Sequence, residues 1–178
     1  MKELLLHVCC APCSTYSIKA FAKKGFQITG FFFNPNIQPY KEFQKRVNTV
    51  QNYFRSQNTP LICNADYLLE DFLRSVPFQK PERCFACYRW RLERTAAEAK
   101  QKQMKFFSTT LLISPFQHHD ALKKICREVQ EKIGGEFIYK DLREGFKEST
   151  EISRREGLYR QNYCGCIFSE KERLLKSR

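Results

Sequence analysis

Short apolar segments alternate with longer amphipathic segments along most of this chain. The short segments are rich in Leu, Ile and Phe, which favours strands, and the longer ones repeat apolar residues at helical spacing. We predict strands over residues 4–8, 27–33, 60–63, 105–109 and 136–139. We predict helices over residues 15–24, 40–57, 65–75, 85–103 and 121–133. This order indicates an α/β fold, a Rossmann-like parallel sheet with helices on both faces.

The pattern changes after Tyr139. Residues 141–157 are polar and helical in spacing, with a break at Gly145, and residues 169–178 predict a short basic helix. Between them lies the cysteine pair Cys164-Gly165-Cys166. This part of the chain therefore carries chemistry without adding a further strand.

The length and the charge limit the domain organisation and the partners. A chain of 178 residues suits one core, so we expect a single α/β domain over residues 1–178, with a helical and loop C-terminal extension over residues 140–178. The formal net charge of +12 is either a solvated surface or a surface for a polyanion, and we favour nucleic acid. No membrane span or signal peptide is apparent, so we expect a cytoplasmic location without membrane partners.

The first predicted strand ends in a turn that holds three thiols, Cys9, Cys10 and Cys13. In α/β folds this turn commonly binds a phosphate at the N-terminus of the following helix, but its glycines are missing here. Thiolates at a helix N-terminus have lowered pKa values and are good metal ligands. The turn therefore predicts metal or redox chemistry.

A second pair, Cys84 and Cys87, has the Cys-x-x-Cys spacing found in zinc sites, iron–sulfur sites and redox dithiols. With Cys9 and Cys10 it offers four thiolates. Adjacent cysteines are unusual for zinc but can reach different irons, so we prefer a 4Fe–4S cluster and leave zinc open. We interpret Cys126, on an apolar helix face, and Cys63 as small hydrophobic residues.

The third pair, Cys164 and Cys166, is separated only by Gly165. A disulfide across so short a loop is strained and easily reduced, which favours a catalytic redox pair. The pair is also compatible with a second metal site, or with half of a structural zinc site completed by Cys13 and a histidine.

Taken together, these motifs resemble the family of cobalamin-independent epoxyqueuosine reductases. The matching segments are residues 5–14, 34–39 with Arg46, 83–88 with 91–92 and 95–96, 109–115, and 159–166. The family often has His where this chain has Gln38, which argues against a catalytic role at that position.

The resemblance implies a fold similar to the adenine nucleotide α-hydrolase (HUP) group and reduction of the epoxide of epoxyqueuosine, at the wobble position of tRNA, to queuosine. This reaction is the last step of queuosine biosynthesis, and it needs an external electron donor. The resemblance further implies a 4Fe–4S cluster on Cys9, Cys10, Cys84 and Cys87 and a redox-active pair, Cys164 and Cys166. It also implies a second, adjacent iron.

Two hypotheses describe the reaction. In one, the second iron, held by Cys13 or Asp141, binds the epoxide oxygen as a Lewis acid. In the other, a thiolate of Cys164 or Cys166 opens the epoxide and the pair ends as a disulfide. We expect the tRNA to contact residues near the cysteines: Arg83, Arg89, Arg91, Arg160 and Tyr163.

The histidines have simpler interpretations. We expect His7 to be structural on the first strand, with proton donation as the lesser alternative, and His118 and His119 to begin a helix.

Two other functions compete with the reductase. An ATP-dependent tRNA-thiolating enzyme of the same fold would carry a Ser-Gly-Gly-x-Asp-Ser loop, which this chain lacks. A zinc-stabilised RNA-binding module would be colourless, whereas an iron–sulfur protein would be brown.

Overall fold

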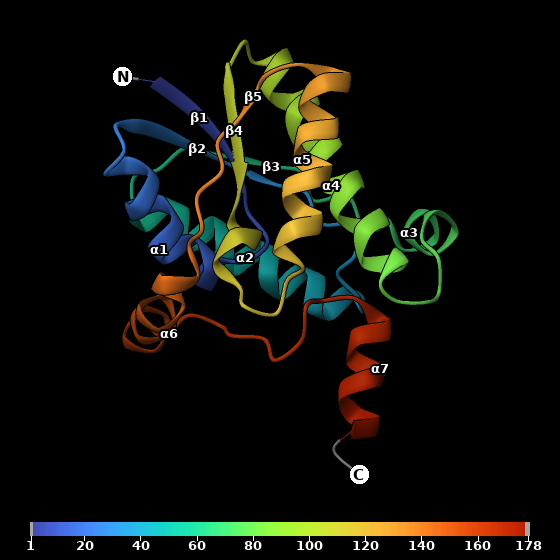
Figure 1. Ribbon diagram of the computed structural model, residues 1–178. Coiled ribbons are helices and arrows are strands. Elements are labelled where there is room, and N and C mark those ends of the chain that lie inside the picture. The colour runs from blue at the N-terminus through green and yellow to red at the C-terminus, as the bar shows by residue number, and fades with distance from the viewer. Residues whose placement is uncertain (1, 177–178) are drawn as a thin grey trace.

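The computed structural model describes residues 2–176 as a five-stranded parallel sheet with helices on both faces (Figure 1). The strand order is β3-β2-β1-β4-β5. The strands are β1 (Lys2–His7), β2 (Phe26–Phe32), β3 (Leu61–Cys63), β4 (Phe106–Thr109) and β5 (Glu136–Phe137). The predicted fold class is confirmed, and every predicted strand is present within two residues of its expected bounds.

The central strand is apolar because both of its faces are covered. Leu4, Leu5 and Leu6 of β1 are all fully buried, and β1 pairs with β2 on one side and with β4 on the other. A strand buried on both faces has no solvent side, so a continuous apolar segment replaces the usual alternation. This explains why the short Leu-rich segment is sufficient to mark the centre of the sheet.

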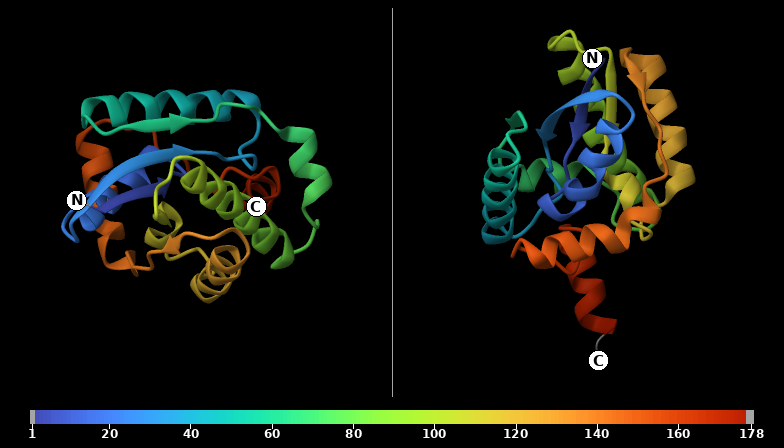
Figure 2. Two further views of the ribbon diagram at one scale, coloured as in Figure 1. Left: turned by 90° about the horizontal axis from the view of Figure 1, so that it is seen from above. Right: turned by 90° about the vertical axis from the view of Figure 1, so that its left-hand side faces the viewer.

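The helices form two layers (Figure 2). Right-handed crossovers place α1 (Ala11–Ala22) and α2 (Tyr40–Ser56) on one face, and α4 (Glu82–Gln101) and α5 (His119–Ile133) on the other. Within these layers α1 contacts α2, and α4 contacts α5. The remaining elements are α3 (Leu69–Ser75), α6 (Phe146–Arg155), α7 (Ile167–Lys176) and two short 3₁₀ turns, η1 (Thr110–Ile113) and η2 (Arg143–Gly145).

Three helix starts differ from the prediction by three residues or more. Helix α1 begins at Ala11 rather than at residue 15, because Pro12 lacks an N–H and has the right φ for the first turn of a helix. Cys13 is therefore a helical residue in the first turn of α1. Helix α4 begins at Glu82 rather than at 85, and α3 begins only at Leu69 rather than at 65.

The C-terminal extension also differs in detail. The predicted helix over 141–157 is divided into η2 and α6, and the division falls at Gly145 as expected. A Cβ on Gly145 would lie 2.1 Å from the ring of Tyr16, so only glycine allows α1 to pack this closely. The predicted tail helix starts at Ile167, and its last two residues, 177–178, lie outside the described residues.

Among residues 2–176, no helix combines the length and the apolar character needed to cross a bilayer.

The strand order favours a ligand site at the carboxyl ends of the strands, next to β1. Strands β2 and β4 lie on opposite sides of β1, so the chain changes direction in the sheet next to the carboxyl end of β1. Ligand sites in open α/β sheets lie at such switch points. The cysteine turn follows β1 at this position.

Candidate metal centre and thiol pair

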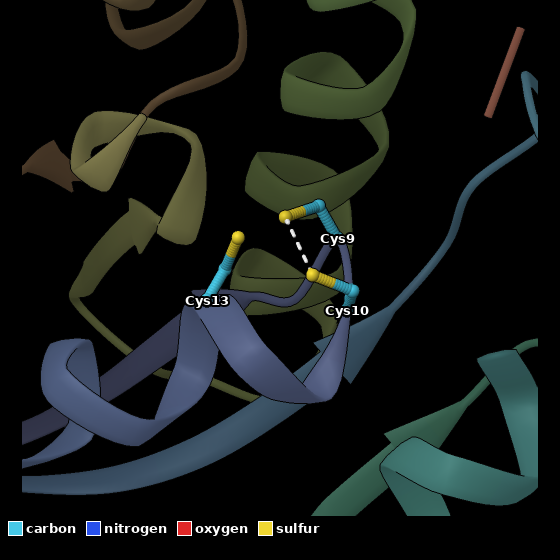
Figure 3. A group of neighbouring side chains, drawn as sticks. All are labelled: Cys9, Cys10 and Cys13. Atoms are coloured by element: carbon cyan, nitrogen blue, oxygen red, sulfur yellow. Dashed lines mark hydrogen bonds between the residues drawn. The ribbon is translucent and has the colours of Figure 1, made fainter. Parts of the chain in front are cut away.

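Three cysteines converge at the carboxyl end of β1. Cys9 and Cys10 lie in the turn, Cys13 lies in the first turn of α1, and their sulfur atoms lie within 4.8 Å of one another (Figure 3). Cys10 is 2% exposed, and the Sγ atoms of Cys9 and Cys10 are 3.8 Å apart. This group, called the cysteine turn below, has the spacing and the donor atoms of a soft-metal site.

Neighbouring strands fix the backbone of the cysteine turn. The N–H of Cys9 donates to the hydroxyl of Thr110 at 3.0 Å, and the same hydroxyl donates to the Cys9 sulfur at 3.2 Å. The side-chain amide of Asn34 donates to the carbonyl of Val8 at 2.8 Å. These contacts come from the ends of β4 and β2, so the turn is held from both sides.

His7 supports the turn as a neutral, structural residue. Burial, with a further contribution from Arg91, lowers the pKa of His7 to about 3. Its Nδ1 lies 2.9 Å from the Thr109 hydroxyl, and its Nε2 lies 3.2 Å from the carbonyl oxygen of Phe33. The ring therefore bridges β4 and the end of β2, which agrees with the structural interpretation of this histidine.

The three thiols share a negative charge unequally. Hydrogen bonds donated by Cys13 and Cys9 hold the pKa of Cys10 well below its usual range. The same contacts raise the pKa of Cys9 to about 12 and raise that of Cys13. Cys10 also lies at the N-cap of α1, where the helix dipole favours a thiolate. A metal cation bound here would replace the donated protons.

The Cys-x-x-Cys pair lies in the first two turns of α4. Cys87 is 7% exposed, and burial raises its pKa to about 11. Within the described residues, only Cys9, Cys10 and Cys13 form a group with metal-site spacing. Cys84 and Cys87 lie outside it, so the joint ligation of one cluster by Cys9, Cys10, Cys84 and Cys87 stays a prediction.

A buried arginine lies among the thiols. Arg91 is 4% exposed, its Nε donates to the carbonyl of Cys87 at 3.2 Å, and its guanidinium interacts electrostatically with Cys9, Cys87 and Cys164. No carboxylate of residues 2–176 forms an ion pair with it. Because an uncompensated buried charge is very costly, the buried guanidinium is stabilised by negative groups such as the surrounding thiolates. A metal cluster bound by thiolates carries such a charge, so these residues fit one.

The third thiol pair lies in the segment between α6 and α7. Cys164 is exposed, Cys166 is 6% exposed, and both are free thiols. A hydrogen bond donated by Cys166 lowers the pKa of Cys164 to about 5, and the same bond raises the pKa of Cys166. Cys166 packs in one apolar cluster with Cys87, so this pair adjoins the α4 cysteines.

The other predicted site residues occupy different environments. Asp141 forms an ion pair with Arg143, which holds its pKa far below the usual range.

The predicted tRNA contacts fall into two groups, buried and exposed. Arg83 is 4% exposed, pairs with Glu172 and lies over the ring of Phe168, and Arg91 faces the thiols. Arg89, paired with Glu128, is half-exposed, Tyr163 is partly exposed and Arg160 is exposed.

Two of the isolated features agree with expectation. Cys126 is fully buried in the core, and α5 begins at His119 with His118 as its N-cap. Cys63 is only partly buried, because it ends the short edge strand β3.

Sequence reasoning named Cys13 as a candidate metal ligand, and the structure places its sulfur in one group with those of Cys9 and Cys10. It interpreted Arg91 as a tRNA contact and missed its electrostatic interaction with the thiols. The spacing carried a signal, because Arg91 follows Cys87 by one helical turn and both lie on one face of α4.

Comparison with known proteins identifies the family of this chain. The family model described as epoxyqueuosine reductase QueH matches residues 4–172. Epoxyqueuosine reductase QueH of Dehalococcoides mccartyi is 36% identical over 174 residues, 98% of this chain and 96% of the relative. The protein of the same name from Thermotoga maritima is 38% identical over 186 residues, 97% and 93% of the two chains. The chain therefore belongs to the epoxyqueuosine reductase QueH family, and the resemblance seen in its motifs is confirmed.

Proposed function

We propose that this protein reduces the epoxide of epoxyqueuosine, at the wobble position of tRNA, to the alkene of queuosine. The observation that carries the proposal is the position of thiols from three distant segments around the buried guanidinium of Arg91. Membership of the reductase family supports it.

We propose a 4Fe–4S cluster as the cofactor, with Cys9, Cys10, Cys84 and Cys87 as its ligands. Such a cluster supplies single-electron transfer when bound. Arg91 compensates the negative charge of the thiolates, and the Thr110 hydroxyl orients the Cys9 sulfur at 3.2 Å. Cys13 lies in the same group of sulfur atoms, and it is our candidate ligand for a second metal ion.

We propose Cys164 and Cys166 as the pair that reacts with the epoxide. The Cys164 thiolate attacks one epoxide carbon, the C–S bond forms, the C–O bond breaks, and the oxygen takes up a proton. The Cys166 thiolate then attacks the Cys164 sulfur, the disulfide forms and the C–S bond breaks. The released electron pair forms the alkene as the hydroxyl, with one further proton, leaves as water. The two thiols lose two electrons, the epoxide gains two, and an external electron donor reduces the disulfide.

The alternative reaction assigns Cys13 and Asp141 to an iron that binds the epoxide oxygen. Asp141 would then have to exchange its ion pair with Arg143 for the metal. The double variant Cys164→Ser/Cys166→Ser separates the two reactions: turnover falls to background if the thiol pair reacts and is retained if it does not.

We propose that the tRNA lies over the carboxyl edge of the sheet. The net charge of +12 favours a polyanion, and Arg160 and Tyr163 border the reactive pair from the exposed side. Arg83 and Arg91 are buried, so tRNA contact by these two requires the site to open. With tRNA as substrate we propose a cytoplasmic protein with one domain.

The proposal is tested in cells. A bacterial strain without its own epoxyqueuosine reductase accumulates epoxyqueuosine, and the gene for this protein is expressed in it. We expect queuosine in the nucleosides of digested tRNA, and a brown, iron-containing protein after anaerobic purification. A colourless zinc protein and tRNA that retains epoxyqueuosine would instead favour the RNA-binding module.

A further inference from the structure

Arg46 of α2 lies beneath the segment that carries Cys164 and Cys166. Its side chain is 2% exposed, and each nitrogen of the guanidinium has an acceptor. Nε donates to Glu42 at 2.6 Å, one terminal nitrogen donates to the carbonyl of Cys164 at 3.0 Å, and the other to the carbonyl of Tyr163 at 3.3 Å. A buried arginine that uses its planar fork in this way fixes two successive peptide groups.

Gln38, in the loop between β2 and α2, holds the same segment by further hydrogen bonds. The backbone N–H of Gln38 donates to the carbonyl of Gly165 at 2.8 Å. The side-chain oxygen of Gln38 accepts from the N–H of Ile167 at 3.1 Å. The Tyr163 hydroxyl donates to the carbonyl of Gln38 at 2.7 Å. Arg46 and Gln38 together are called the bracket below. They form hydrogen bonds with Tyr163, Cys164, Gly165 and Ile167.

The bracket explains the glycine between the two cysteines. Gly165 has a φ of +113°, which side chains rarely adopt, and a Cβ there would lie 3.0 Å from both Arg46 and Ile37. The backbone at Gly165 thus lies so close to Arg46 that a side chain there would not fit without a shift. Because the carbonyls of Tyr163 and Cys164 face Arg46, the peptide plane is fixed. Cys166 packs in an apolar cluster with Cys87 and Phe72.

We propose that Arg46 is a positioning residue that holds Cys164 and Cys166 toward the cysteines of α4. This inference rests on the proposed function, because it gives the pair a reason to be held. Arg46 acts through the peptide groups of the segment rather than on the substrate. Its role requires the fork of the guanidinium, since one lysine nitrogen cannot serve Glu42 and both carbonyls at these distances.

Two simpler roles for Arg46 make different predictions. A charge that only stabilises the nearby Cys10 thiolate would be supplied equally well by lysine. A residue that only stabilises α2 through the i,i+4 pair with Glu42 would affect the whole fold and not one segment. The matched control is Arg94, which forms an i,i+4 pair with Glu98 on α4, two helical turns beyond Cys87.

The experiment compares the full-length, metal-loaded wild type with Arg46→Lys, Arg46→Met and Arg94→Met. Backbone hydrogen exchange is followed by mass spectrometry in peptides covering residues 1–22 and 158–170. Turnover of epoxyqueuosine tRNA gives kcat and KM, and visible absorption reports the cluster.

In both Arg46 variants we expect the backbone hydrogen exchange of residues 158–170 to be at least about 10-fold faster than in the wild type. The exchange rates of residues 1–22 should be unchanged. We expect kcat to fall about 10- to 100-fold, as a misplacement near 1 Å produces, with KM and absorption unchanged. Arg94→Met should match the wild type. Full rescue by lysine, or faster exchange throughout the chain, would overturn the proposal. If the wild type does not reduce epoxyqueuosine at all, the proposed function fails, while the exchange data still decide whether Arg46 holds the segment.

Discussion

The cysteine turn lies between a strand and a helix, whereas the segment from Tyr163 to Ile167 lies outside regular structure until α7 begins at its last residue. The turn inherits its shape from regular structure: the N–H of Val8 donates to the carbonyl of Phe31 at 2.8 Å, and Cys10 is the N-cap of α1. The segment is held by side chains from far away in the sequence, since Arg46 and Cys164 are 118 positions apart.

This difference predicts which substitutions should disturb each of the two regions. Distant substitutions other than those of Thr110 and Asn34, whose side chains bond the turn, should leave the cysteine turn intact, because the sheet and α1 determine most of its backbone. The Tyr163–Ile167 segment should respond to single side chains of α2 and of the preceding loop. We infer that the turn provides a rigid metal site and that the segment provides the reactive part.

The largest expected effect is at the turn itself. Replacing Cys10, the buried thiolate, with serine removes a soft ligand from the group of three thiols. We expect Cys10→Ser to lose most of its iron, and its turnover to fall to background, as measured by metal analysis and tRNA digestion. Cys63→Ser, at the edge strand, is the control and should keep both. Full iron content in Cys10→Ser would remove this residue from the ligand set.

Arg91 connects the two regions, so its loss should affect the electronic properties of the site. In Arg91→Met the chain keeps a similar volume but loses the positive charge beside Cys9, Cys87 and Cys164. We expect the midpoint potential of the bound cluster to become more negative, because reduction adds charge that is no longer compensated. Redox titration followed by electron paramagnetic resonance measures this change. An unchanged potential would show that Arg91 does not face the cluster.

Gly165 tests the segment alone. In Gly165→Ala the added Cβ meets Arg46 at 3.0 Å in a left-handed conformation, which costs about 1 kcal/mol or more. We expect kcat to fall about 10-fold while iron content stays at the wild-type level. Gly25→Ala, at an open turn with a similar positive φ, is the control for backbone strain without a contact. Equal kcat values for the two variants would contradict the close approach at Gly165.

The smallest expected effect is at the exposed side of the segment. Arg160→Ala should raise KM for tRNA a few-fold and reduce the salt dependence of binding by about one charge, with kcat unchanged. Binding measured over a range of salt concentrations checks this. Lys102→Ala, just after the C-terminal end of α4, is the control for loss of charge elsewhere. Equal salt dependence in both variants would remove Arg160 from the tRNA surface.

The sequence allowed prediction of what depends on local pattern. The apolar segment at Leu4–Leu6 marked the buried central strand, and the break at Gly145 was visible as a glycine in a polar helix. The start of α1 was placed too late because cysteines obscured the helix signal that Pro12 provided. Short-range pattern thus located the elements but not the ends that carry the chemistry.

The convergence of side chains was beyond local pattern. Arg46 reaches Cys164, 118 positions away, only because α2 passes beneath the C-terminal segment. Buried arginines are rare, so Lys and Arg are assumed to lie on the surface. Arg46, Arg83 and Arg91 are all exceptions, and each has partners supplied by tertiary packing.

The central claim is that the thiols of this site remove the epoxide oxygen. The most direct measurement incubates purified, iron-loaded protein with epoxyqueuosine tRNA and a low-potential chemical reductant under anaerobic conditions, followed by mass analysis of the digested nucleosides. The account predicts conversion of epoxyqueuosine to queuosine, with the loss of one oxygen atom, by the wild type and not by Cys164→Ser/Cys166→Ser. Persistence of epoxyqueuosine with the wild type, or equal conversion by the double variant, would contradict it.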